Sequence, residues 1–170
     1  EVEHYLSEGY LTEEIFIIAP SIKNSKSPVK VLANLLSENK YPVFIPSSDE
    51  EKIEEDMITN KIVFATFHQI KGLERKVIIC YGVDDGYYKY NAPKCSTFEC
   101  PNPIYVGLTR SLEHCSIIHH QENSFMDFMN TEQIQELCWT ESIDEVRRNK
   151  SFKLSVVGNW QAYPVNNIFE

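Results

Sequence analysis

Short, continuous apolar runs alternate along this chain with segments of helical character, and this alternation constrains the fold more than any other feature. The apolar runs suit strands buried on both faces of a sheet, because neither face is left polar. Strands that alternate with helices predict an α/β fold with a mainly parallel sheet flanked by helices. The predicted strands cover residues 15–19, 43–45, 62–65, 77–81 and 115–119.

Cap and turn residues place helices between these strands. Ser27 followed by Pro28 predicts the start of one helix, and Ser48 with Glu51 has the spacing of a capping box that opens another at 49–57. Further predicted segments are a polar lead-in at 1–14, one helical turn at 69–73, an irregular segment at 83–103, helices at 102–112, 124–129 and 132–137, and a strand at 152–157.

Length and composition predict one domain. At 170 residues the chain can bury roughly 70% of its unfolded surface in one core and is short for two. We expect a single domain over 1–170, with its core at about 15–120 and a peripheral tail at 121–170. No apolar run approaches the ~18 residues of a membrane helix, and nothing at the amino terminus resembles a signal peptide. We therefore expect no membrane contact and an intracellular location, cytoplasmic or nuclear.

Charge and cysteine usage narrow the class of site. The formal charge of −9 has the wrong sign for a free-standing nucleic-acid binder, but residues 61–120 carry +2 and are compatible with a local anion-binding face. Five cysteines, scattered over different elements, fit a reducing compartment. The C-x4-C spacing of Cys95 and Cys100 is more typical of loop thiols than of a zinc site, and we predict no metal site.

Two stretches place polar side chains next to apolar segments. The first, T-F-H-Q-I-K-G-L-E, follows the strand at 62–65, and the second, Y-V-G-L-T-R, ends at Arg110. In open α/β sheets ligands bind beyond the carboxyl ends of the strands, so we expect the polar groups of the first stretch at that edge.

The polar groups of these stretches suit phosphate and sugar recognition. Hydroxyl, imidazole and ammonium groups can donate to phosphates, and a glycine lets the backbone approach a ligand. A carboxylate can accept from a sugar hydroxyl, and the planar fork of a guanidinium can reach a separate phosphate. These candidates are, in that order, Thr66, His68, Lys71, Gly72, Glu74 and Arg110.

Taken together, the two stretches resemble known motifs. Residues 66–74 resemble motif V, and 105–110 resemble motif VI, of superfamily 1 helicases of the UvrD/Rep/PcrA type. Residues 15–46 are similar to the region just before these motifs. The resemblance covers about 15–120 and implies the carboxyl-terminal RecA-like (2A) domain of an ATP-dependent DNA helicase, with a P-loop NTPase-type fold.

The resemblance implies a role for the nucleotide-side residues. Arg110 would be the catalytic arginine finger, which reaches the γ-phosphate of ATP bound on the first RecA-like domain. Glu74 would contact the ribose, with Gly72 beside it, so that all three belong to the ATP site. The chain has no G-x-x-x-x-G-K-[ST] loop. ATP and Mg²⁺ would therefore be bound mainly by the first domain, and this chain would be an inactive fragment of a longer helicase when isolated.

The nucleic-acid side follows from the same resemblance. Thr66 and His68 match residues that touch the backbone of single-stranded DNA. Lys71 would join them as a hydrogen-bond donor to a backbone phosphate. Domain closure on ATP hydrolysis would then ratchet the strand. The implied partners are single-stranded DNA and the upstream RecA-like domain of the same protein. The K-G-L-E form favours DNA, although the residues do not by themselves distinguish DNA from RNA.

Three positions depart from the family pattern, and two other functions stay open. Ile70 stands where the family usually has serine or alanine, Arg75 where it has an aromatic residue, and Gly107 where it has alanine.

One alternative function is a catalytically silent, helicase-like module that binds a protein or nucleic acid. Another is a flavodoxin-like enzyme for a small ligand, for which the chain shows no recognisable nucleophile, acid or metal set.

Overall fold

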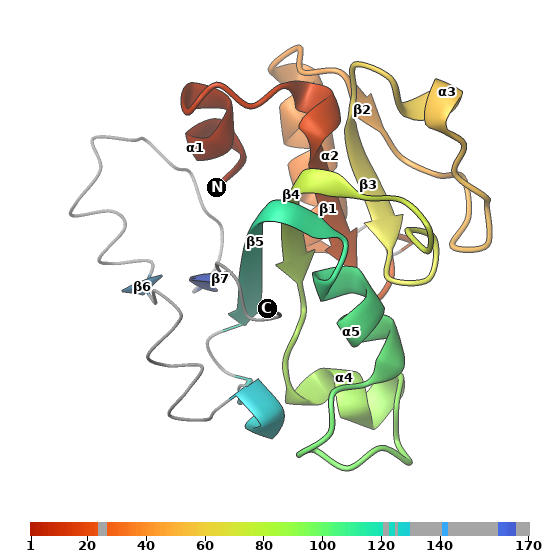
Figure 1. Ribbon diagram of the computed structural model, residues 1–170, viewed down its shortest axis with the longest axis vertical. Coiled ribbons are helices and arrows are strands. Elements are labelled where there is room, and N and C mark those ends of the chain that lie inside the picture. The colour runs from red at the N-terminus through yellow and green to blue at the C-terminus, as the bar shows by residue number, and fades with distance from the viewer. Residues whose placement is uncertain (24–26, 121–122, 125, 130–140, 143–159, 166–170) are drawn as a thin grey trace.

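A parallel sheet forms the centre of the molecule (Figure 1). The computed structural model describes residues 1–23, 27–120, 123–124, 126–129, 141–142 and 160–165. Within these residues the strand order is β2-β3-β1-β4-β5-β7-β6, and the first five are parallel. This confirms the predicted α/β fold, which is compatible with a RecA-like arrangement. The parallel strands are β1 (Ile15–Ala19), β2 (Val43–Phe44), β3 (Ile62–Thr66), β4 (Arg75–Tyr81) and β5 (Ser111–His120).

The carboxyl-terminal part of the chain adds an antiparallel edge. Strand β7 (Trp160–Val165) pairs with β5, with Cys115 opposite Val165, and β6 (Glu141–Ser142) pairs with β7. The segment W-Q-A-Y-P, which the sequence left without an assignment, is therefore a strand of the sheet. The helix predicted at 132–137 and the strand predicted at 152–157 lie outside the described residues.

Each face of the sheet carries its own hydrophobic cluster. Side chains alternate along β1, so Phe16 and Ile18 enter one cluster whereas Ile15 and Ile17 enter the other. Helices α4 (Asp85–Tyr90) and α5 (Asn102–Leu108) cover the first cluster, and α1 (Val2–Ser7) and α2 (Pro28–Glu38) cover the second (Figure 1). No helix within the described residues is both long and apolar enough to cross a bilayer.

The predicted cap residues are correct for α2 and wrong for the helix predicted at 49–57. The Ser27 hydroxyl caps α2 by accepting from the Lys30 N–H, as predicted. The helix predicted at 49–57 is wrong, because only α3 (Glu55–Ile58) forms. The carboxylate of Glu51 accepts from the hydroxyl and N–H of Ser47, which lowers the pKa of Glu51, so no capping box forms.

Other boundaries also differ from the prediction. The irregular segment at 83–103 contains α4, whose cap is Asp84. Helix α5 ends at Leu108 rather than 112, because the Thr109 hydroxyl and the Arg110 Nε donate to its last carbonyls and β5 begins at Ser111. The lead-in at 1–14 holds α1 and the turn η1 (Thr12–Glu14), and residues 69–73 form no helical turn. Among the described residues of 124–129, only η2 (Asp127–Met129) is helical.

Helix α5 lies against the sheet because position 107 has no side chain. A Cβ atom built on Gly107 would lie 2.5 Å from Cδ1 of Phe67 and 3.0 Å from Cδ1 of Ile18. Phe67 is 2% exposed and packs edge-on against Tyr87 at 6.0 Å between ring centroids. The ring of Phe67 therefore occupies the space that an alanine side chain would take.

We expect Gly107→Ala to lower the free energy of unfolding by about 1–3 kcal/mol, because the added methyl group overpacks a closed core. Urea denaturation followed by circular dichroism measures the change. Phe67→Leu should recover part of the loss when combined with Gly107→Ala, although it is destabilising alone. Additive losses in the double variant would contradict this packing argument.

Candidate functional site

Two of the three predicted ATP-site residues form an ion pair. Nη1 of Arg110 lies 3.3 Å from Oε1 of Glu74. Arg110 also donates from Nε to the Val106 carbonyl at 3.2 Å and from Nη2 to the Thr109 hydroxyl at 3.4 Å. The side chains of Arg110 and Glu74 are 25% and 52% exposed, so a ligand can reach both. Residues far apart in the sequence thus meet at one place.

This pair lies at the amino-terminal edge of the sheet. Glu74 immediately precedes β4, Arg110 immediately precedes β5, and the Arg75 N–H donates to the Arg110 carbonyl at 3.1 Å. The expectation that the polar groups of the first stretch gather at the carboxyl edge is therefore wrong for Glu74. The loop after β3 runs back across the sheet before β4 begins, so its last residue reaches the opposite edge.

Gly72, the third predicted ATP-site residue, is exposed and has a φ of 87°. A Cβ atom built there would have no neighbour within 4 Å, so the glycine is required by its backbone conformation and not by packing. The space beside it is open to an approaching group.

Arg75 belongs to the structure of this edge, a role that the sequence did not reveal. Its guanidinium donates to both carboxylate oxygens of Glu55, at 2.7 and 3.3 Å. The guanidinium carbon lies 4.6 Å from the centroid of the Phe16 ring. A flat cation thus covers the aromatic core at the position where the resemblance predicts an aromatic residue.

Thr66 is held by Gln69, which the sequence analysis did not select. Oε1 of Gln69 accepts from the Thr66 N–H at 2.9 Å and from its hydroxyl at 3.1 Å. Nε2 of Gln69 donates to the carbonyls of Ser48 and Glu51, both at 2.9 Å. Thr66 is only 2% exposed, so its hydroxyl positions the loop and is not presented to a ligand in this conformation.

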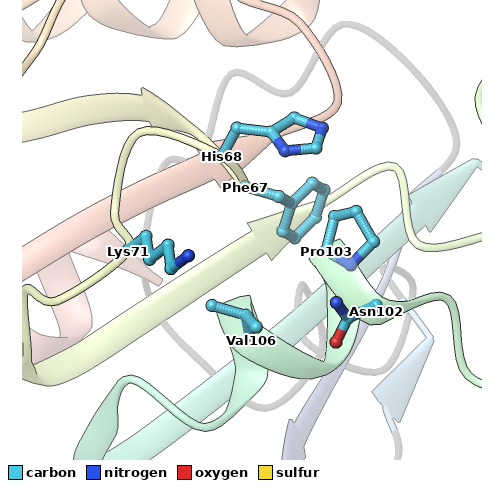
Figure 2. A pocket seen from close by; sticks show the side chains of 6 residues that line it. All are labelled: Phe67, His68, Lys71, Asn102, Pro103 and Val106. Atoms are coloured by element: carbon cyan, nitrogen blue, oxygen red, sulfur yellow. The ribbon is translucent and has the colours of Figure 1, made fainter.

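His68 and Lys71, by contrast, line a pocket of about 180 Å³ between this loop and α5 (Figure 2). Both side chains are exposed, and within the described part of the chain neither has a hydrogen bond or ion pair. In Figure 2 the ammonium group of Lys71 points across the pocket toward α5. The six residues that line the pocket are Phe67, His68, Lys71, Asn102, Pro103 and Val106.

The predicted site residues therefore fall into two places joined by one loop. Glu74 and Arg110 lie at the amino-terminal edge of the sheet, whereas His68 and Lys71 line the pocket that follows the carboxyl end of β3. Gly72 lies between them on the loop, and Thr66 is buried at the end of β3. Where the structure describes the chain, no group of three or more His, Cys, Asp or Glu side chains is placed to hold a metal ion.

Comparison with known proteins leaves the chain without an assigned family. No protein-family model matches it, and no curated protein matches it either. Among solved structures, the crystal structure of Thermoplasma acidophilum 1320 is similar with a TM-score of 0.42 and 11% sequence identity, over 98% of this chain and 86% of that chain. A likeness at this level supports no conclusion about function.

Gln69→Ala should lower the free energy of unfolding by about 1–3 kcal/mol, because the variant removes the acceptor of the Thr66 hydroxyl and N–H and the side-chain donor to the Ser48 and Glu51 carbonyls, of which only that of Ser48 keeps another donor, the Glu51 N–H. Thermal and urea unfolding of the purified chain measure the loss. The matched control is the neighbouring His68→Ala, which should stay within about 0.5 kcal/mol of wild type since His68 is exposed. Equal effects of the two variants would contradict the anchoring role of Gln69.

Proposed function

We propose that this chain is the second, carboxyl-terminal RecA-like domain of an ATP-dependent DNA helicase. It would supply Arg110 in trans to ATP held by an upstream RecA-like domain. The observation that carries the proposal is the ion pair of Glu74 and Arg110. The two residues that the motifs assign to ribose and γ-phosphate come from separate elements and lie within hydrogen-bonding distance of each other.

The geometry of this pair fits a nucleotide phosphate and sugar. Nε of Arg110 bonds to the Val106 carbonyl of α5 and Nη2 to the hydroxyl of Thr109, the residue that follows α5, whereas Nη1 faces Glu74. A phosphate oxygen could replace the Glu74 carboxylate as the partner of Nη1 without loss of the contacts that orient the guanidinium. Glu74, which is half exposed, would then be able to accept from a ribose hydroxyl.

Bound ATP supplies a transferable γ-phosphoryl group, whose negative charge spreads over its oxygens during hydrolysis. Arg110 would stabilise this charge as an arginine finger. The chain lacks a P-loop, and its described residues offer no carboxylate cluster for Mg²⁺, so triphosphate and metal would be held mainly by the other domain. Hydrolysis would require both domains together.

His68 and Lys71 would contact the backbone of a single strand. They lie on the same loop as Glu74, so the nucleic-acid side and the nucleotide side share one covalent segment. Movement of that loop on domain closure would link hydrolysis to translocation along the strand.

A catalytically silent, helicase-like binding module is the second candidate. Thr66 favours it, because the hydroxyl that the motif assigns to nucleic acid is buried and bonded to Gln69. In such a module the Glu74–Arg110 ion pair would only stabilise the structure where β4 and β5 begin.

Arg110→Ala distinguishes the two candidates. In the protein that joins this chain to its P-loop domain, the substitution should reduce ATP turnover stimulated by single-stranded DNA by about a hundredfold or more. Arg110→Lys should recover only a part, because an ammonium group lacks the planar fork. The matched control is Lys94→Ala, which removes an exposed positive charge from the segment between α4 and α5.

Folding of each variant is compared by thermal unfolding before turnover is measured. Unchanged turnover in Arg110→Ala would exclude the arginine-finger role. An absence of strand-stimulated turnover in the wild-type protein would favour the silent module.

A further inference from the structure

Two cysteines flank a tight turn in the segment between α4 and α5. Cys95 and Cys100 are both free thiols, and both are only partly buried. The Glu99 N–H donates to the Ser96 carbonyl at 3.0 Å, which closes a turn over 96–99 directly between the two cysteines. A turn of this kind brings the chain on its two sides back together, into the range of Cα separations that a disulfide can span.

Contacts inside and outside the turn bring the two thiols toward each other. Sγ of Cys95 lies 3.8 Å from the carbonyl oxygen of Glu99, the residue that directly precedes Cys100. The Tyr88 hydroxyl, which comes from α4, donates to the carbonyls of Thr97 and Glu99 at 3.1 and 2.7 Å. The turn is therefore held in place by a residue that lies outside it.

A second pair of cysteines shows that close sulfur atoms alone do not make a reactive site. Sγ of Cys80 and Sγ of Cys115 are 3.9 Å apart on the neighbouring strands β4 and β5. Their residues are 0% and 6% exposed, and burial raises the pKa of Cys80 well above its usual range. A dissolved oxidant does not reach such thiols, and they stay protonated. This buried pair is an internal control for the exposed one.

The surroundings of Cys95 and Cys100 give them different roles. Burial in the first place, and the nearby Cys95 in addition, raise the pKa of Cys100 to about 11. Cys100 is therefore protonated at neutral pH and is a poor first nucleophile, since the thiolate is the form that reacts. Cys95 would react first with an oxidant, and Cys100 would then resolve the product.

We propose that Cys95 and Cys100 form a reversible disulfide, which makes the segment before α5 a redox modification site. The site does not depend on the proposed function. Cys100 directly precedes Pro101, the residue that caps α5, so the bridge would tie the start of this helix to the turn at 96–99.

A peroxide is the oxidant class that completes the reaction in two steps. The Cys95 sulfur attacks one peroxide oxygen, so that an S–O bond forms, the O–O bond breaks and water leaves with the thiol proton. The Cys100 sulfur then attacks the sulfur of the resulting sulfenic acid. The S–S bond forms, the S–O bond breaks, and the second thiol proton leaves in a second water. Two thiols are oxidised, and one peroxide is reduced to two waters.

The test treats the complete, reduced protein with hydrogen peroxide, then unfolds it in urea with iodoacetamide and digests it with trypsin. Cleavage after Lys94 and Arg110 gives the peptide 95–110, which contains Cys95 and Cys100 and no other cysteine. Mass spectrometry should show this peptide without alkylation and lighter by two hydrogen atoms, and dithiothreitol should restore both thiols. The bridge should form at least about tenfold faster than Cys80 is oxidised in the peptide 77–89.

Substitutions test the assigned roles. Cys100→Ser should leave a sulfenic acid on Cys95 that dimedone traps, whereas Cys95→Ser should leave Cys100 as a thiol. Tyr88→Phe keeps the ring but removes the hydroxyl that holds the turn, so bridge formation should slow by about threefold or more. An unchanged rate in Tyr88→Phe would contradict the positioning by this turn.

Two results would overturn the disulfide itself. One is a peptide 95–110 that stays fully alkylated at a peroxide concentration that oxidises Cys80. The other is a bridge from Cys95 to any cysteine other than Cys100.

Discussion

The connection from β3 to β4 is the constraint on which this site depends. Strand β1 lies between β3 and β4, and all three are parallel, so the chain must return from the carboxyl edge to the amino edge while it passes over β1. Such crossovers usually take a dozen or more residues and a helix. Here only residues 67–74 are available, with a reach of at most about 29 Å, and the return along the strands alone requires roughly 20 Å. The loop has little slack, and its residues are therefore spread from one edge of the sheet to the other.

This short crossing explains why the polar side chains of the loop at 67–74 lie at two separate places. Phe67 and Ile70 are buried under the loop, Gln69 ties it to two carbonyls of the segment before α3, and Gly72 turns it with a positive φ. His68 and Lys71, between these anchors, remain exposed, and Glu74 arrives beside Arg110. Because the middle of the loop is anchored, coupling between its ends would require the loop and the segment at 46–54 to move together rather than the loop to flex alone. In the proposed function, the nucleic-acid strand and the nucleotide would thus be linked through a rigid segment of the protein.

The strands were predictable from the sequence because their burial on both faces produces uninterrupted apolar runs, as in β1 and β3. The Ser27 cap of α2 was predictable for an equally local reason. The position of Glu74 was not, since a short connection does not reveal which strand lies between its two ends. Gln69 was missed because its partners include backbone carbonyls from a distant segment, which leave no pattern in the sequence. The helix predicted at 49–57 was wrong because the spacing of Ser48 and Glu51 suits a capping box. The carboxylate of Glu51 instead accepts a hydrogen bond from Ser47.

The Phe67 ring fills the space left by the missing side chain of Gly107, and this packing connects the core to the pocket. Without a side chain at 107, α5 can approach the sheet until the Phe67 ring lies beneath it. That ring then forms part of the pocket wall together with Pro103 and Val106, which lie on the same helix. An alanine at 107 would push either the ring or the helix outward, and both movements would change the shape of the pocket. The glycine at 107 therefore affects more than stability, because it sets the distance between α5 and the loop that carries Lys71.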